Sequence, residues 1–147
     1  MAIAIRYPLQ RLLAAQGGFD GPAIAAPIVG ILAALTGRSW ELRGEVVDSV
    51  EAPEDIGQPW IVHRFRWKLR AARGRRKAEL ELLLAETALN MSYQDYDVYR
   101  ATLRLADGRV LLVDGAIAAH ESTLLCAEGF AEEALLRACA AASVPLR

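Results

Sequence analysis

The sequence predicts an α+β fold in which a curved, five-stranded antiparallel sheet wraps around a central helix. Three observations lead to this prediction: an apolar stretch with helix boundaries over residues 21–36, two-residue alternation over 39–50 and 61–84, and the turn sequence Asp107-Gly108. Alternation is typical of half-buried strands, whereas a helix that is apolar on all sides is expected to be buried. We expect N-terminal helices and a long C-terminal helix to complete the fold.

The composition indicates a single folded domain over residues 1–147. Hydrophobic residues make up 54% and charged residues 24% of the chain, which excludes wholesale disorder. The net charge of −1 argues against a general polyanion binder but leaves room for a local basic patch. The apolar run 23–35 is much shorter than the ~20 residues of a membrane span. Because the N-terminal residues also lack a signal-peptide pattern, we expect a cytoplasmic protein without a membrane span.

The N-terminal part predicts one short strand followed by two helices. Residues 1–7 alternate between apolar and other side chains, and Pro8 suits the first turn of a helix that ends at Gly17-Gly18. The second helix covers 21–36. Asp20 is placed to cap its N-terminus, and Gly37 follows its last turn.

The central part predicts a strand over 39–50, a loop over 52–59 and a hairpin over 61–84. In the first strand, Trp40, Leu42, Val46, Asp48 and Val50 share one parity and are assigned to the buried face. In the hairpin, pairing residues whose numbers sum to 147 places basic side chains opposite acidic ones on one face. The same register pairs apolar residues on the other face, so both faces support it.

The C-terminal part predicts a loop over 90–97, a second hairpin and a long helix. Asp107-Gly108 forms a two-residue turn between strands 98–106 and 109–118, and Ser122 caps a helix that reaches residue 142. Cys126 and Cys139 are too far apart along this helix to bond, so we expect two free thiols. Helix-grip, hot-dog and cone-like folds all have this general arrangement of a sheet around a helix.

Five residues with ionisable or hydroxyl groups are predicted on the inner face of the sheet. His63 and Glu86 are diagonal neighbours in the first hairpin, while Asp48, Tyr99 and Asp114 share the parity of apolar neighbours. A buried charge is costly unless it is paired or hydrated, so such a group is a candidate for a site. The simpler interpretation places these residues at strand ends, where the inner face meets solvent.

These residues suggest a domain that binds a small hydrophobic or acyl-type molecule. In one form of this hypothesis the domain also has acid–base activity. In that version His63 is the general base or orienting group and Glu86 its partner, and Asp48, Tyr99 and Asp114 line the pocket. The chain has no GxSxG, P-loop, GxGxxG, HExxH or Cys/His metal spacing. We therefore expect no cofactor and no metal, and the sequence leaves open whether the chain is an enzyme.

A basic segment supports a different function. Residues 64–77 contain eight Arg or Lys residues and no acidic residue. The alternative is therefore a non-enzymatic assembly or adaptor protein that binds a protein or anionic partner through the sheet edge and this hairpin. The expected anion contacts are Arg64, Arg66, Arg73, Arg75 and Arg76. A solvated, salt-bridged hairpin accounts for the same residues, and a homodimer is the other expected assembly.

Overall fold

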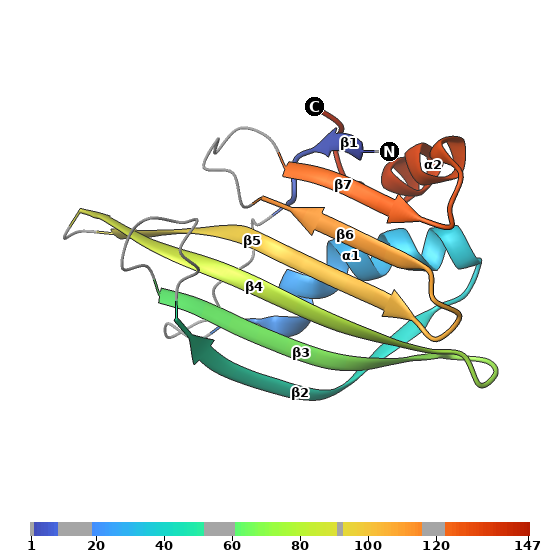
Figure 1. The fold of residues 1–147 in the computed structure, drawn as a ribbon, viewed down its shortest axis with the longest axis horizontal. Helices are drawn as coiled ribbons and strands as arrows, with labels where there is room; N and C mark the ends of the chain where they lie inside the picture. The colour runs from blue at the N-terminus through green and yellow to red at the C-terminus, as the bar shows by residue number, and fades with distance from the viewer. Residues whose placement is uncertain (1, 9–18, 52–60, 91–92, 116–122) are drawn as a thin grey trace.

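The computed structural model describes residues 2–8, 19–51, 61–90, 93–115 and 123–147. Over these residues the chain forms two helices and seven strands (Figure 1). In chain order they are β1 (Ala2–Ile5), α1 (Gly21–Thr36), β2 (Trp40–Val50), β3 (Ile61–Ala71), β4 (Lys77–Asn90), β5 (Tyr93–Leu105), β6 (Val110–Asp114), β7 (Thr123–Glu128) and α2 (Glu132–Ala141).

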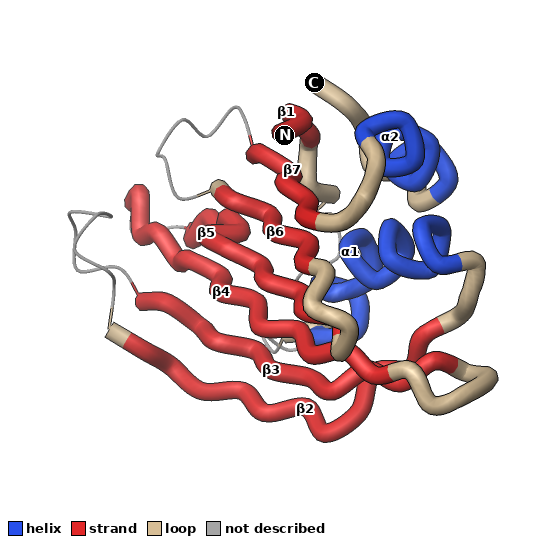
Figure 2. The backbone as a smooth tube through the Cα atoms, turned by 45° about the vertical axis from the view of Figure 1, so that its right-hand side comes forward, coloured by secondary structure: helices blue, strands red, loops and turns tan. Residues whose placement is uncertain are grey.

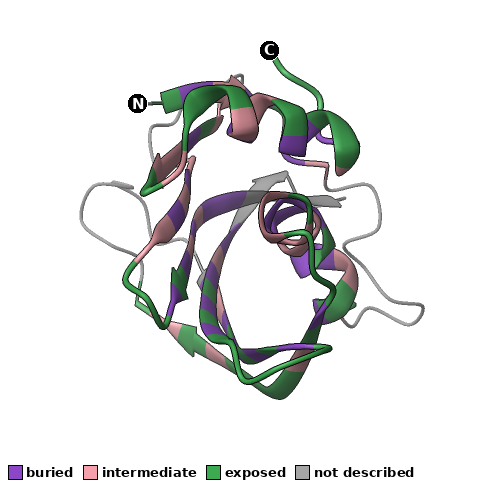
Figure 3. Ribbon diagram, turned by 90° about the vertical axis from the view of Figure 1, so that its right-hand side faces the viewer, coloured by how far each residue is buried: buried purple, intermediate pink, exposed green. Residues whose placement is uncertain are grey.

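All seven strands form one antiparallel sheet in the order β1-β7-β6-β5-β4-β3-β2. The sheet is strongly curved, with α1 against its concave side and α2 beside α1 near β7 (Figures 2 and 3). We call the sheet face toward α1 the inner face and the opposite one the outer face. The inner face carries the core, including Phe65, Leu69, Leu80, Leu82 and Leu103, all 1% exposed or less.

The ends of α1 agree with the sequence. The Asp20 carboxylate accepts a hydrogen bond from the Ala23 amide at 3.1 Å, and Gly37 ends the helix in the left-handed conformation with φ of 65°. One side of the helix is buried, with Ile24, Ile28 and Ile31 no more than 1% exposed. The expectation that the helix is buried on all sides is wrong, because Pro22, Ala26 and Ala34 are exposed.

The predicted register of the first hairpin is confirmed from Ile61 to Arg70 of β3. Arg66 pairs with Glu81, Trp67 with Leu80, and Lys68 with Glu79. Opposite charges thus face each other on the outer side while Trp67 and Leu80 are buried on the inner side. Because a shift of one residue would bury the charges, the alternation determines the register.

The predicted fold class is wrong in its strand count and in its long C-terminal helix. The described sheet has seven strands rather than five, and the described residues contain two helices. The predicted helix before Gly17-Gly18 and the loop 52–59 lie outside the described residues. The mixed helix and antiparallel-sheet content is confirmed.

The predicted C-terminal helix over 122–142 is mostly replaced by a strand and a shorter helix. Residues of β7 pair with both β6 and β1, so β7 joins the N-terminal strand to the rest of the sheet. Gly129 then takes a φ of 86°, which a continuous right-handed helix does not allow, and α2 begins only at Glu132. The helical spacing of Leu124, Ala127 and Ala131 therefore misled the sequence prediction.

The predicted loop over 90–97 is also wrong, since β4 continues to Asn90 and β5 begins at Tyr93. The two edges of the sheet differ. C-terminal residues border β1, where the Arg6 amide bonds to the Pro145 carbonyl and the Arg147 amide to the Ala4 carbonyl, both within 3.0 Å. At the opposite edge, β2 is the last strand of the sheet.

Candidate functional site

His63 lies where the sequence predicts it. It pairs with Leu84 in a regular part of β3 and has the parity of Phe65 and Trp67, which places it on the inner face. The residue is half-buried, and its ring centroid lies 4.7 Å from that of Phe19, just before α1. The inner-face prediction for His63 is therefore confirmed.

Asp48 lies on the outer face, not on the predicted inner face. The pairing of β2 with β3 shifts between Arg43 and Val46, where Gly44 has a φ of 63°. Such a β-bulge adds one residue and reverses the parity of everything after it. Asp48 consequently pairs with Arg64, and its carboxylate accepts two hydrogen bonds from that guanidinium.

Asp114 is displaced by a similar effect. The turn at Asp107-Gly108 holds three residues rather than two, since the Leu105 amide bonds to the Arg109 carbonyl at 2.9 Å and Gly108 has a φ of 92°. The register therefore shifts by one, and Asp114 pairs with Arg100 instead of the predicted Ala101. Leu111 and Val113 take the inner positions, so Asp114 lies on the outer face.

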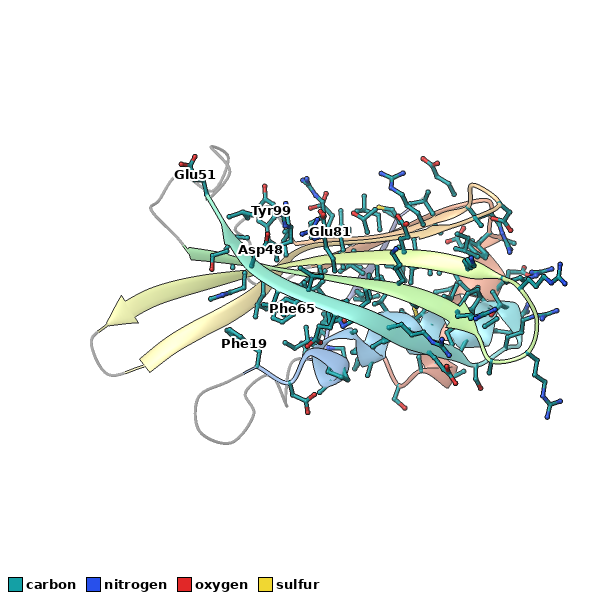
Figure 4. The ribbon with its side chains drawn as sticks, turned by 90° about the horizontal axis from the view of Figure 1, so that it is seen from below. Phe19, Asp48, Glu51, Phe65, Glu81 and Tyr99 are labelled. Atoms are coloured by element: carbon teal, nitrogen blue, oxygen red, sulfur yellow. The ribbon has the colours of Figure 1, made fainter. Side chains whose placement is uncertain are left out.

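Tyr99 is the inserted residue where the pairing of β4 with β5 shifts between Leu83 and Leu84. Leu83 pairs with Arg100 and Leu84 with Val98, which leaves Tyr99 between two pairs. Its side chain lies on the same side of the sheet as Glu81, opposite Phe65 and Phe19 (Figure 4). Tyr99 is 4% exposed, and the guanidinium carbon of Arg100 lies 5.2 Å from its ring centroid.

The structure thus separates the predicted site residues. His63 is on the inner face, whereas Asp48, Tyr99 and Asp114 are on the outer face. Glu86 pairs with Ile61 through its backbone, but its side chain lies outside the described part of the chain. Among the described side chains, the predicted pocket of His63 with Asp48, Tyr99 and Asp114 is not formed.

The predicted anion contacts divide into two groups. Arg64 and Arg66 lie on the outer face and share the Asp48 carboxylate, with Arg66 Nη2 at 3.8 Å from Asp48 Oδ2. The hydrogen bonds from Arg64 lower the pKa of Asp48 and raise that of Arg64, since each favours the charged form of the other. These two arginines are therefore already partly neutralised within the chain.

The second group lies at the tip of the β3–β4 hairpin. Arg73, Arg75 and Arg76 belong to the turn between the strands, followed by Lys77 at the start of β4, and all four are exposed. Arg38, in the turn between α1 and β2, reaches this hairpin and donates a hydrogen bond to the Arg73 carbonyl at 2.9 Å. We call these five residues the hairpin-end basic cluster.

No described carboxylate forms an ion pair with a member of this cluster. The neighbouring acid, Asp107, is bound by Arg109 through its backbone amide and guanidinium, both at 3.0 Å. The pKa of Asp107 is lowered, mainly by the hydrogen bond from the Arg109 backbone amide. The Arg109 guanidinium and the charge of Arg76 lower it further. Its charge is thus shared with Arg109, and the cluster keeps a positive excess.

A hollow of about 460 Å³ lies within this end of the molecule. It is lined by Trp40, Arg75, Arg76, Lys77, Leu105, Ala106 and Asp107. Three cationic residues and one acidic residue, Asp107, therefore line a recess with an apolar wall. The arginines of the hairpin turn could be predicted from the sequence. Arg38 was missed because its position beside the hairpin depends on how α1 leads into β2.

Two further searches of the described residues gave negative results. No three His, Cys, Asp or Glu side chains among them gather as metal ligands would. No helix in the described ranges is both long and apolar enough to cross a membrane. Comparison of the chain with protein-family models, with curated proteins and with solved structures gave no match.

Proposed function

We propose that this chain is a non-enzymatic binding protein that holds an acidic segment of a partner protein at the hairpin-end basic cluster. The observation that carries the proposal is the gathering of five cationic side chains from two turns and the start of β4, without a described carboxylate paired to any of them. Guanidinium groups bind carboxylates through two parallel hydrogen bonds, which suits an acidic peptide.

The surroundings of the cluster favour an acidic peptide over single-stranded nucleic acid. Proteins that bind single strands combine basic grooves with aromatic side chains on which bases stack. Phe65 and Trp67 lie on the inner face and are 1% and 3% exposed, while Trp40 beside the hollow is 8% exposed. The described residues near the cluster therefore supply charge without an open stacking surface.

The test is fluorescence anisotropy with a labelled oligoglutamate peptide. The wild-type chain should bind it at low salt and lose affinity as salt is added, because exposed charges are screened. Arg75→Glu combined with Arg76→Glu should weaken binding by roughly tenfold or more. Arg137→Glu, at another exposed arginine on α2, should leave binding within about twofold after allowance for the smaller charge change.

Failure of the wild-type chain to bind would contradict the proposal. Equal weakening by the hairpin double variant and by Arg137→Glu combined with Arg147→Glu would also contradict it, because net charge alone would then explain binding. A single-stranded oligonucleotide of equal charge serves as the competing probe. If it binds more tightly than the peptide, the partner is not an acidic protein segment.

The small-molecule function stays a prediction. Its support is now the position of His63 on the inner face beside Phe19, without Asp48, Tyr99 or Asp114. We propose a reducing compartment such as the cytoplasm, which the free thiols of Cys126 and Cys139 support.

A further inference from the structure

A second surface, which shares Trp40 with the hollow at the basic cluster, lies between α1 and the edge strand β2. It is an open groove of about 720 Å³. The residues that line it are Pro22, Ala26, Val29, Gly30, Ala33, Ser39, Trp40, Glu41, Leu42 and Arg43. The helix side of the groove is formed entirely by apolar or small residues.

The helix that forms this wall has no charged side chain anywhere along residues 21–36. Surface helices of monomeric proteins ordinarily carry polar residues on the face away from the core. Here the side that lines the groove includes Pro22 and Ala26, which are exposed, and Val29 and Ala33, which are half-buried. The apolar surface of α1 thus extends beyond what the sheet and α2 cover.

The rim of the groove on β2 carries charges of both signs. Glu41 and Arg43 form an ion pair at 2.9 Å, with their side chains 57% and 58% exposed. Two adjacent charges of opposite sign are self-complementary under a two-fold rotation, because each can meet the other residue of a second copy. The net charge of −1 on the whole chain adds little repulsion between copies.

We propose that a second copy of this chain covers the groove in a two-fold symmetric dimer. The apolar side of α1 in each copy packs against the groove of the other, and Glu41 of each copy pairs with Arg43 of the other. An apolar small molecule fits the observations less well, because the groove is open and its rim presents a balanced pair of charges. Closed, largely apolar pockets are typical of small-molecule sites.

The charge pairing gives a reciprocal test by light scattering coupled to size-exclusion chromatography. The wild-type chain should elute at twice its mass of 16.0 kDa. Glu41→Arg alone and Arg43→Glu alone should each raise the dimer dissociation constant by roughly tenfold or more, since like charges then meet. An equal mixture of the two variants should recover the dimer, because each rim of one variant then opposes the complementary rim of the other.

The apolar contact has its own matched pair of variants. Ala26→Glu introduces a charge inside the groove and should dissociate the dimer, whereas Ala34→Glu, at an exposed position of α1 outside the groove, should not. Both alanines are exposed, so each variant should keep the circular dichroism spectrum and unfolding midpoint of the wild-type chain. Those measurements separate loss of the interface from loss of the fold.

A wild-type chain that is monomeric at its highest soluble concentration would overturn the proposal. So would a dimer that persists in Ala26→Glu, which would place the contact elsewhere, or a mixture of the rim variants that stays monomeric. A monomer that binds 1-anilinonaphthalene-8-sulfonate, with binding lost in Ala26→Glu, would assign the groove to an apolar ligand instead of a second copy.

Discussion

Tyr7 links the end of β1 to α1 through one buried hydroxyl. Its side chain is in the core, and its hydroxyl donates a hydrogen bond to the Ile24 carbonyl in the first turns of the helix. Burial raises the pKa of this phenol far above its ordinary value of 10.0. The neutral hydroxyl is thus the form that the folded chain stabilises.

Replacing Tyr7 by Phe should lower the free energy of unfolding by about 1 kcal/mol at neutral pH, the ordinary contribution of one hydrogen bond. The difference in the free energy of unfolding between the two proteins should decrease at alkaline pH. Because the folded pKa is raised, the stabilisation is fully present below the unfolded pKa and is lost as pH rises from the unfolded toward the folded pKa, so the wild-type chain should lose its advantage over the Phe variant above about pH 10. Urea unfolding at several pH values measures both effects, and equal stability at neutral pH would contradict the assigned bond.

Among elements, the bulge in β2 has the largest consequences for the surface. Gly44 adopts a left-handed conformation there, and the shifted register turns the Glu45 side chain inward, where Glu45 Oε1 accepts a hydrogen bond from Trp67 Nε1 at 2.9 Å. A Cβ atom on Gly21 would lie 2.0 Å from the same oxygen. Glycine at position 21 therefore leaves room for the Glu45 carboxylate at the start of α1, where it bonds to Trp67 of β3.

Gly44→Ala should lower the free energy of unfolding by about 1 kcal/mol, because an L-residue is strained at positive φ. Ser49→Ala is the matched control, since Ser49 is exposed on the same strand in a regular part of the pairing. Thermal or urea unfolding gives the comparison. If the two variants are equally stable, the bulge does not depend on glycine and another residue can set the parity of β2.

For the molecule as a whole, the charge on the outer face of the sheet alternates between basic and acidic from one strand to the next. Arg64, Arg66 and Lys68 on β3 lie between Asp48 on β2 and the glutamates of β4. The outer charges are thus largely compensated, whereas the hairpin-end basic cluster is not. That contrast makes one end of the molecule electrostatically distinct and supports the proposed site there.

Part of the acid sensitivity of the fold should come from Asp48. Because the Arg64 hydrogen bonds depress its folded pKa, its stabilisation is present above the unfolded pKa and is lost as pH falls through the folded one. Asp48→Asn should therefore be less stable than the wild-type chain at neutral pH, and the difference should shrink toward about pH 2. Glu51→Gln, at an exposed carboxylate just beyond β2, is the control and should leave the free energy of unfolding at neutral pH nearly unchanged.

Features that depend on neighbouring residues could be predicted from the sequence. The caps of α1 follow from Asp20 and Gly37, and the register of β3 with β4 follows from alternating charge and apolar side chains, which have one arrangement that satisfies both faces. His63 was placed correctly because β3 pairs with β4 without a shift across it. These features need no information from distant parts of the chain.

Contacts between distant segments set which face Asp48, Tyr99 and Asp114 occupy and where the sheet ends. Asp48, Tyr99 and Asp114 each lie at or beyond a bulge or a three-residue turn, and one inserted residue reverses parity while leaving the local alternation of the sequence unchanged. β7 formed where helical spacing predicted a helix because its backbone groups pair with β6 and with β1, over a hundred residues earlier in the chain. Pairing partners and inserted residues are set by contacts between distant segments, and a pattern read along a single segment does not contain them.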